Sequence, residues 1–278
     1  MTPVAHSATV AAFQALHRTG CFLLPNPWDI GSAKYLHHLG FKALATTSSG
    51  YAFTRGLPDE VWAMKRDDVL AHVRDVVGAT PLPVNADFQS GYADDPEGVA
   101  ANVVLCVQSG AAGLSIEDAT GKKDAPLYER SLAIERVRAA RKAIDSTGIP
   151  VVLTARCEAW LVGHPDPLTV ALDRLVAFAG AGADCLFAPG VRDADQIAAI
   201  VKAVAPKPVN VIMSAPSAEL SLARLQDLGV RRISVGSALA RVAWGAFMRA
   251  ARNLRETESF ESFNNAATFA ELNQLFGG

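Results

Sequence analysis

Short apolar runs recur along the chain, and a longer stretch with the spacing of an amphipathic helix follows each of them. Glycines stand before several of these runs, and a glycine after a helix accepts the left-handed conformation that ends it. Strands that alternate with helices in this way predict a parallel sheet. The runs predicted to be strands are 22–24, 43–46, 83–86, 113–116, 150–153, 185–187, 208–211 and 233–235.

Eight such units in roughly 220 residues predict a closed (β/α)₈ TIM barrel, and a doubly wound open sheet is the alternative. A helix over residues 7–18 would cover the lower end of the barrel. We expect residues 1–278 to form one barrel domain, with 241–278 as a C-terminal helical extension. Helical stretches over 242–255 and 263–276 follow no strand, so their apolar face must pack on the barrel or on a partner subunit.

Polar residues mark the predicted starts of several helices. Asp59 would open a helix that runs toward Val77, and Pro96 suits the first turn of another. Ser131 and Asp193 are candidate N-caps, because their side chains can accept a hydrogen bond from the first helical turn.

The composition narrows the class of protein. Half of the residues are hydrophobic, which allows a large core, and a net charge of -2 gives no general attraction to nucleic acid or anionic membranes. No apolar run approaches the ~18 residues that span a bilayer, and the N-terminus lacks the pattern of a secretory signal. The four cysteines have no CxxC spacing, so we expect reduced thiols in a cytoplasmic protein.

Candidate chemistry lies where three neighbouring strands end. In a barrel of this type the catalytic groups stand at the carboxyl ends of the strands. Asp87 and Glu117, with Asp118, would form an oxygen-only site that suits Mg²⁺ or Mn²⁺, and Arg156 can bind a carboxylate with two donors. Each residue alone could be a helix cap or an ion-pair partner, but three such ends together favour function. The turn over 49–51 could aim backbone N–H groups at an anion.

The strand ends carry neither lysine nor histidine. A Schiff-base mechanism needs a desolvated lysine, and histidine-ligated zinc or iron needs imidazoles, so neither is expected. The predicted pocket therefore suits a small, doubly anionic ligand that chelates a metal, such as an α-oxo acid or its enolate.

Several motifs resemble those of the isocitrate lyase/phosphoenolpyruvate mutase superfamily, over roughly residues 20–240. They are Leu-Pro-Asn-Pro-Trp-Asp-Ile-Gly-Ser-Ala at 24–33, Thr-Ser-Ser-Gly-Tyr at 47–51, Asn-Ala-Asp at 85–87 with Gly-Tyr at 91–92, Ser-Ile-Glu-Asp at 115–118, Thr-Ala-Arg-Cys-Glu-Ala at 154–159, and Ala-Pro-Gly-Val-Arg-Asp at 188–193.

The resemblance implies a Mg²⁺-dependent barrel that binds α-oxo acids, stabilises an enolate and swaps its last helix between subunits of dimers that pair into tetramers. It implies that the amides around Ser49, Gly50 and Tyr51 hold the substrate carboxylate. It assigns the metal to Asp87 and Glu117, and it places an outer carboxylate at Asp59. Arg156 would bind the oxo-acid oxygens, and Asn210 would be a further substrate contact.

Two departures from the family pattern refine this expectation. Asn85 stands where the family usually has an aspartate, so this possible metal ligand lacks a negative charge and should bind Mg²⁺ more weakly. The loop over 118–127 has neither the cysteine nor the histidine of the isocitrate and methylisocitrate lyases, and it is shorter than the gating loop of the mutases. Cleavage of isocitrate or methylisocitrate and rearrangement of phosphonopyruvate are therefore not expected.

We expect a Mg²⁺-dependent carbon–carbon lyase that decarboxylates or splits a small α-oxo (di)carboxylate through an enolate. Tyr51, Thr120, Lys123 or a metal-bound water could donate the proton. The alternatives are P–C cleavage of the phosphonopyruvate hydrolase type and a non-catalytic α-oxo acid binding protein. The expected partners are the small substrate and further copies of the chain, with no nucleic acid and no membrane.

Overall fold

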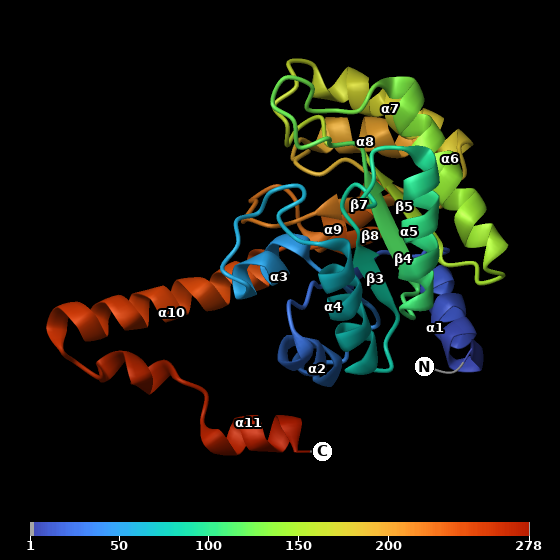
Figure 1. The fold of residues 1–278 in the computed structure, drawn as a ribbon. Coiled ribbons are helices and arrows are strands. Elements are labelled where there is room, and N and C mark those ends of the chain that lie inside the picture. The colour runs from blue at the N-terminus through green and yellow to red at the C-terminus, as the bar shows by residue number, and fades with distance from the viewer. Residues whose placement is uncertain (1–2, 278) are drawn as a thin grey trace.

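The apolar runs of the sequence form eight short parallel strands at the centre of the molecule (Figure 1). This computed structural model describes residues 3–277. Parallel strands with helices on their outer face bury both of their sides, which is why these runs are apolar rather than alternating. The strands are β1 (Phe22–Leu24), β2 (Leu44–Ala45), β3 (Val84–Asp87), β4 (Gly113–Glu117), β5 (Val152–Arg156), β6 (Cys185–Phe187), β7 (Val209–Ile212) and β8 (Arg232–Ser234).

The strands pair in the order β1-β8-β7-β6-β5-β4-β3-β2, so the sheet curls until its two outer strands meet. At the seam, Ala45 N donates to Pro25 O at 3.0 Å. Asn26 strengthens this seam, because its amide donates to Thr46 O and accepts from the backbone N–H groups of Val235 and Gly236. The (β/α)₈ barrel prediction is confirmed, and the open-sheet alternative is wrong.

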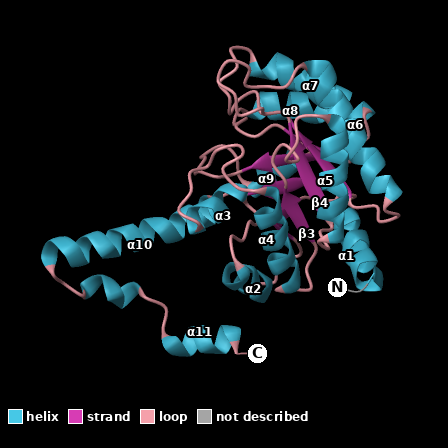
Figure 2. Ribbon diagram, in the orientation of Figure 1, coloured by secondary structure: helices cyan, strands magenta, loops and turns pink. Residues whose placement is uncertain are grey.

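Helices cover the outside of the barrel (Figure 2). The core lies between them and the strands, where Val73, Val103, Leu114, Leu153 and Leu186 are fully buried. The helices are α1 (Pro3–Leu16), α2 (Ile30–His38), α3 (Ser48–Thr54), α4 (Arg66–Gly78), α5 (Pro96–Gln108), α6 (Arg130–Ser146), α7 (Pro167–Gly180), α8 (Ala194–Val204), α9 (Leu222–Asp227), α10 (Ala238–Thr257) and α11 (Phe269–Phe276), with a 3₁₀ turn η1 (Glu261–Asn265).

Two predicted helix starts are wrong, and two are confirmed. Asp59 lies in the loop before α4, which begins only at Arg66. In that loop Trp62 has a left-handed backbone (φ 72°), which interrupts helical geometry. Glu129, rather than Ser131, caps α6, because its carboxylate accepts from both the N–H and the hydroxyl of Ser131. Pro96 stands at the first turn of α5, and Asp193 caps α8 by accepting from Gln196 N.

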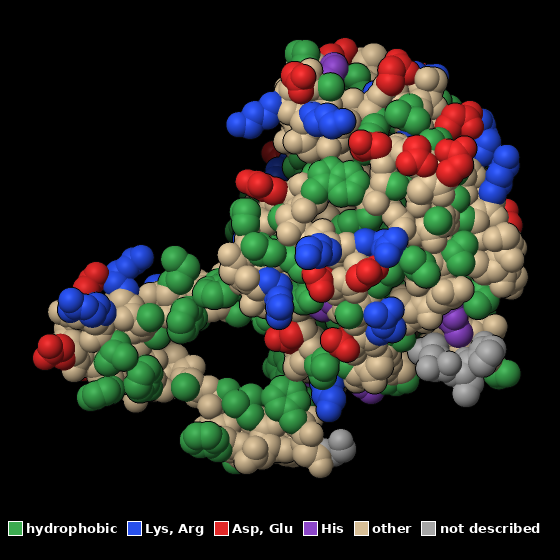
Figure 3. Space-filling view, in the orientation of Figure 1, with side chains coloured by type: hydrophobic (Ala, Val, Ile, Leu, Met, Phe, Trp, Pro, Cys, Tyr) green, Lys and Arg blue, Asp and Glu red, His purple; other side chains and the backbone are tan. Residues whose placement is uncertain are grey.

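The chain beyond the barrel forms an arm. Helix α10 runs away from the barrel, and α11 turns back to pack on α2, where Phe276 lies beside Gly31 (Figure 1). Large apolar side chains of the arm face solvent, including Val242, Phe247 and Phe269 (Figure 3). The apolar face of α10 therefore does not pack on its own barrel, whereas α11 does contact it. Within residues 3–277, no helix is long and apolar enough to span a membrane.

Candidate active site

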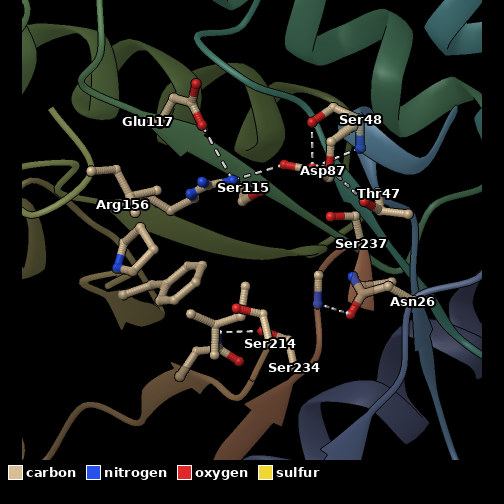
Figure 4. Close-up of a pocket in the computed structure, with 18 of the residues that line it drawn as sticks. Asn26, Thr47, Ser48, Asp87, Ser115, Glu117, Arg156, Ser214, Ser234 and Ser237 are labelled. Atoms are coloured by element: carbon tan, nitrogen blue, oxygen red, sulfur yellow. Dashed lines mark hydrogen bonds and ion pairs between the residues drawn. The ribbon is translucent and has the colours of Figure 1, made fainter. Parts of the chain in front are cut away.

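A cavity of about 780 Å³ opens at the carboxyl ends of the strands. Strands β3, β4 and β5 end with Asp87, Glu117 and Arg156, and all three side chains line this cavity (Figure 4). The ladder places Glu117 directly beside Arg156 on the neighbouring strand. The closed barrel thus brings together the three strand ends that the sequence singled out.

Arg156 binds three carboxylates at once. Its Nη1 lies 2.8 Å from Asp87 Oδ1 and 3.2 Å from Glu117 Oε2. Its Nε lies 2.8 Å from Glu158 Oε1. All four side chains are largely buried, so this cluster combines three acidic groups with one cation in a poorly solvated place.

Burial, with the neighbouring carboxylates, makes Glu117 and Glu158 hold their protons more tightly, so their pKa values rise. Burial raises the pKa of Glu117 well above its usual value, and neighbouring carboxylates add to that shift against the opposing effect of Arg156. Burial likewise raises the pKa of Glu158 to about 7. Asp59 lines the cavity from its loop, and loss of solvent followed by the charge of Asp87 raises its pKa as well. The site is therefore short of positive charge.

Asp118 takes no part in this cavity. It accepts from Glu158 N at 2.8 Å and pairs with Arg174 at 3.0 Å, behind the cavity wall. Since it does not line the cavity, its role is to fix the backbone that carries Glu158.

The residues present fit a divalent cation held largely through water. Asn85 lines the cavity, and its buried Oδ1 has no hydrogen-bond partner among the described residues. That oxygen faces Gly113 at the start of β4, next to Phe13. The feature that a hard cation would satisfy is the acidic excess of three carboxylates around one guanidinium. Over residues 3–277, no group of three or more His, Cys, Asp and Glu could hold a metal ion directly. Mg²⁺ commonly keeps several waters and uses only one or two carboxylates, so the two observations are compatible.

The turn at the start of α3 holds Asp87 rather than presenting all its amides to a ligand. Ser48 donates to Asp87 Oδ2 through both its N–H (2.9 Å) and its hydroxyl (2.8 Å). The predicted anion-binding amides of Gly50 and Tyr51 already bond to Thr47, which caps the helix. Ser48 and Ser49 line the cavity, whereas Gly50 and Tyr51 do not.

The three side chains predicted as proton donors lie outside the lining of the cavity. The ring of Tyr51 stacks on His72 at a centroid distance of 4.0 Å, because α3 turns it toward α4. Thr120 donates to Ala125 O and accepts from Lys122 N, which fixes its own loop. Lys123 is exposed. Their placement gives these predicted roles no support.

The opposite wall consists of hydroxyl groups, an amide and arginines. Asn210, a predicted substrate contact, lines the cavity together with Ser214, Ser234 and Arg232. The sequence did not predict Ser48, Ser234 or Arg232 as site residues. Arg232 escaped prediction because the expected strand begins at Ile233, whereas β8 begins one residue earlier.

Comparison with known proteins agrees with this geometry. Residues 13–255 match the protein family described as phosphoenolpyruvate phosphomutase. The chain belongs to the phosphoenolpyruvate mutase/isocitrate lyase superfamily. Among superfamily members, the oxaloacetate decarboxylase of Rhodopseudomonas palustris (strain BisB5) is 33% identical over 217 residues, which cover 74% of this chain and 70% of that protein.

Solved structures of the superfamily share the whole architecture. A protein of Burkholderia cenocepacia J2315, provisionally named a lyase/mutase, superposes with a TM-score of 0.94 at 47% identity and covers 99% of this chain and 98% of its own. Oxaloacetate acetylhydrolase, solved with its product oxalate, gives a TM-score of 0.86 at 25% identity, covering 98% of this chain and 94% of that one.

Proposed function

We propose that this protein is a Mg²⁺-dependent carbon–carbon lyase that acts on a small α-oxo dicarboxylate through an enolate. The observation that carries the proposal is the buried cluster of three carboxylates around the single guanidinium of Arg156. Such a cluster is costly unless a further cation completes it. The names of the relatives, oxaloacetate decarboxylase and oxaloacetate acetylhydrolase, support the oxo-acid substrate.

In this proposal Asp87, Glu117 and Asn85 hold the cation, and Asp59 orders its waters from the outer side. When bound, Mg²⁺ would supply positive charge where the enolate oxygen develops. Ser48 keeps Asp87 oriented through two hydrogen bonds. Arg156 lines the cavity, so we assign its guanidinium to the substrate oxygens as well as to the carboxylates it holds.

For decarboxylation, the electron pair of the broken carbon–carbon bond moves into the enolate, CO₂ leaves, and a proton then returns to carbon. The walls of the cavity offer Arg156 to spread the negative charge before that proton arrives. We assign the proton to a water in the cavity, because Tyr51, Thr120 and Lys123 do not line it.

The test is turnover of oxaloacetate by the purified protein with Mg²⁺, followed as pyruvate release with and without a chelator. Asp87→Ala should lower the rate by roughly a hundredfold or more, because it removes a charge needed at the reacting centre. Asp67→Ala, at an exposed ion pair on α4, is the matched control and should behave as wild type. Equal turnover by the Asp87 variant would remove the metal assignment.

Two other outcomes identify the rival functions. Mg²⁺-dependent stabilisation by oxalate without turnover of any oxo diacid would indicate a binding protein, in which Asn85 reflects weaker metal binding. Release of inorganic phosphate from phosphonopyruvate would indicate P–C hydrolysis.

We also propose that the arm, which extends the single barrel domain beyond residue 240, packs on a partner subunit. Its exposed apolar residues support this, since Val242 is 68% and Phe247 is 61% exposed in the single chain. A swapped last helix in a dimer or tetramer would cover them. Light scattering should give a mass above one chain, and Phe247→Glu should lower it.

A further inference from the structure

The loop over residues 88–95, which joins β3 to α5, has a strained backbone. Gln89 (φ 44°) and Tyr92 (φ 56°) are left-handed although neither is a glycine, and Gly91 between them is left-handed as well (φ 76°). A non-glycine residue in this conformation costs free energy, and two of them so close together persist only where the surrounding structure holds them. Strain of this kind is concentrated at functional sites, and this loop directly follows the cavity residue Asp87.

Buried donors hold the backbone of this loop in place. The guanidinium of the buried Arg136 donates to three of its carbonyl oxygens, and the amide of the buried Asn102 donates to two more. The backbone N–H of Glu117 donates to Gln89 O at 2.9 Å. The loop is therefore fixed against the end of β4, and Gln89 stands beside the carboxylate side of the cavity.

The side chain of Gln89 has a defined orientation. Gln89 is only 7% exposed, it lines the cavity, and its Oε1 lies 2.8 Å from the hydroxyl of Tyr92. Burial, followed by the charges of Asp87 and Glu117, raises the pKa of Tyr92, so the phenol keeps its proton. That proton needs an acceptor, and within residues 3–277 it finds one in the amide oxygen of Gln89.

The amide nitrogen of Gln89 is the end left for a ligand. It makes no hydrogen bond with any of the residues 3–277, the carboxylates of Asp87 and Glu117 included. An amide nitrogen donates two hydrogens and accepts none, so it cannot bind a cation. A water bound to a cation turns its hydrogens outward and offers this nitrogen no good acceptor. An anionic oxygen of a ligand can accept from it.

We propose that Gln89 donates a hydrogen bond from its amide to an anionic oxygen of the ligand at the metal side of the cavity, and that Tyr92 is the positioning residue that fixes this amide. The inference rests on the function proposed above and adds a binding residue to it. The strained loop and its buried donors hold the amide in place before the ligand arrives, which lowers the cost of binding.

The test measures the affinity for Mg²⁺ and then, at saturating Mg²⁺, the affinity for oxalate, both by calorimetry. Oxalate is the product bound in the structure of oxaloacetate acetylhydrolase. Gln89→Met keeps the length of the side chain and removes the donor, so oxalate should bind roughly tenfold more weakly while Mg²⁺ stays within about twofold. Gln108→Met and Tyr35→Phe, at exposed positions away from the cavity, are the matched controls and should change neither affinity.

Gln89→Glu distinguishes a hydrogen-bond donor from a structural support of the loop. The glutamate has the same size but presents only acceptors and a negative charge, at a pH that keeps it ionised. Oxalate should therefore bind roughly a hundredfold more weakly, whereas Mg²⁺ binding should be kept or tightened by the charge added beside Asp87 and Glu117. Damage to the loop would instead weaken both affinities.

Tyr92→Phe tests the positioning role. Without the hydroxyl group, the amide of Gln89 can turn its oxygen toward the ligand, so oxalate should bind about threefold to tenfold more weakly with the Mg²⁺ affinity kept. In the double variant Gln89→Met/Tyr92→Phe, the loss should equal that of Gln89→Met alone, because Tyr92 acts through Gln89.

Three outcomes would overturn the inference. Gln89→Met could bind oxalate as wild type does, Gln89→Glu could lose Mg²⁺ and oxalate together, or the losses in the double variant could add, which would make Tyr92 independent of Gln89. If the wild-type protein binds no oxalate with Mg²⁺, the proposed function itself fails and the inference fails with it. That result is distinct from the other three, because it appears before any residue is changed.

Discussion

Two arginines lie close to one cavity, yet their surroundings are opposite. Arg156, at the β5 end, binds three carboxylates. Arg232, inside β8, binds an amide, a hydroxyl and an imidazole, but no carboxylate among residues 3–277. One side of the cavity thus has too little positive charge and the other has an uncompensated cation. A ligand that combines a metal ion with a second anionic group would correct both sides together.

The largest difference between the two arginines should appear in the free energy of unfolding when each is replaced by methionine. Arg156→Met leaves buried carboxylates unpaired and should lower the free energy of unfolding by about 3–5 kcal/mol without Mg²⁺. Arg232→Met removes an unpaired charge together with its hydrogen bonds, so we expect a loss below about 2 kcal/mol. Denaturant titration with a chelator present measures both.

Added Mg²⁺ sharpens this prediction, because a cation should restore part of the stability of Arg156→Met and none of that of Arg232→Met. Equal losses in the two variants would show that the charge imbalance between the two walls has no energetic consequence.

Lowering the pH should reduce the free energy of unfolding through His17, which contacts Arg232. Burial, with the charge of Arg232, lowers the pKa of His17 from 6.5 to about 3. The neutral ring therefore contributes its full stability above about pH 6.5, and that contribution is lost as the pH falls toward 3. At pH 4.5 the loss should be about 2–3 kcal/mol.

The matched variant is His17→Gln, whose unfolding free energy should fall less steeply between pH 6.5 and 4.5. His72, whose pKa burial lowers to about 4, is present in both proteins and cancels in the difference. Identical slopes would mean that His17 does not titrate against Arg232.

On the carboxylate side, Asn85→Asp should tighten Mg²⁺ binding by roughly tenfold, because it adds a negative charge beside Asp87 and Glu117. The same change should lower the melting temperature in a chelator, since the acidic excess grows. Calorimetric titration with Mg²⁺ and melting with and without the ion test both parts. Unchanged affinity would place the cation away from Asn85.

The smallest effects on turnover are expected from substitutions of residues that do not line the cavity. Tyr51→Phe, Thr120→Ala and Lys123→Ala each remove a group that does not line the cavity, so turnover of oxaloacetate should change by less than about threefold. A large loss in any one of them would identify the proton donor and would show that its loop moves during the reaction.

The sequence predicted the elements better than it predicted where side chains point. The barrel follows from the alternation of apolar runs and helices, and the convergence of Asp87, Glu117 and Arg156 follows from their common place at strand ends. The direction of Tyr51 was not predictable, because it depends on the turn that α3 makes after Thr47 to stack that ring on His72.

Arg232 illustrates a second limit. A pair of basic residues before an apolar run reads as a solvated strand start, and Arg231 does lie nearer to the surface. Which of the two enters the barrel depends on the register of β8 against β7, where Asn210 stands directly opposite Arg232. A non-local pairing of this kind leaves no local trace in the sequence.

Helix α10 belongs both to the cavity rim and to the arm that projects from the barrel. Its first turn contributes Arg241 to the cavity rim beside Ser237, and its later turns carry the apolar residues that project from the barrel. A partner subunit that packs on the outer turns, as we propose, would also fix the cavity rim, because α10 is one continuous helix. Under that proposal, dilution would weaken the association of chains and the affinity for the substrate together.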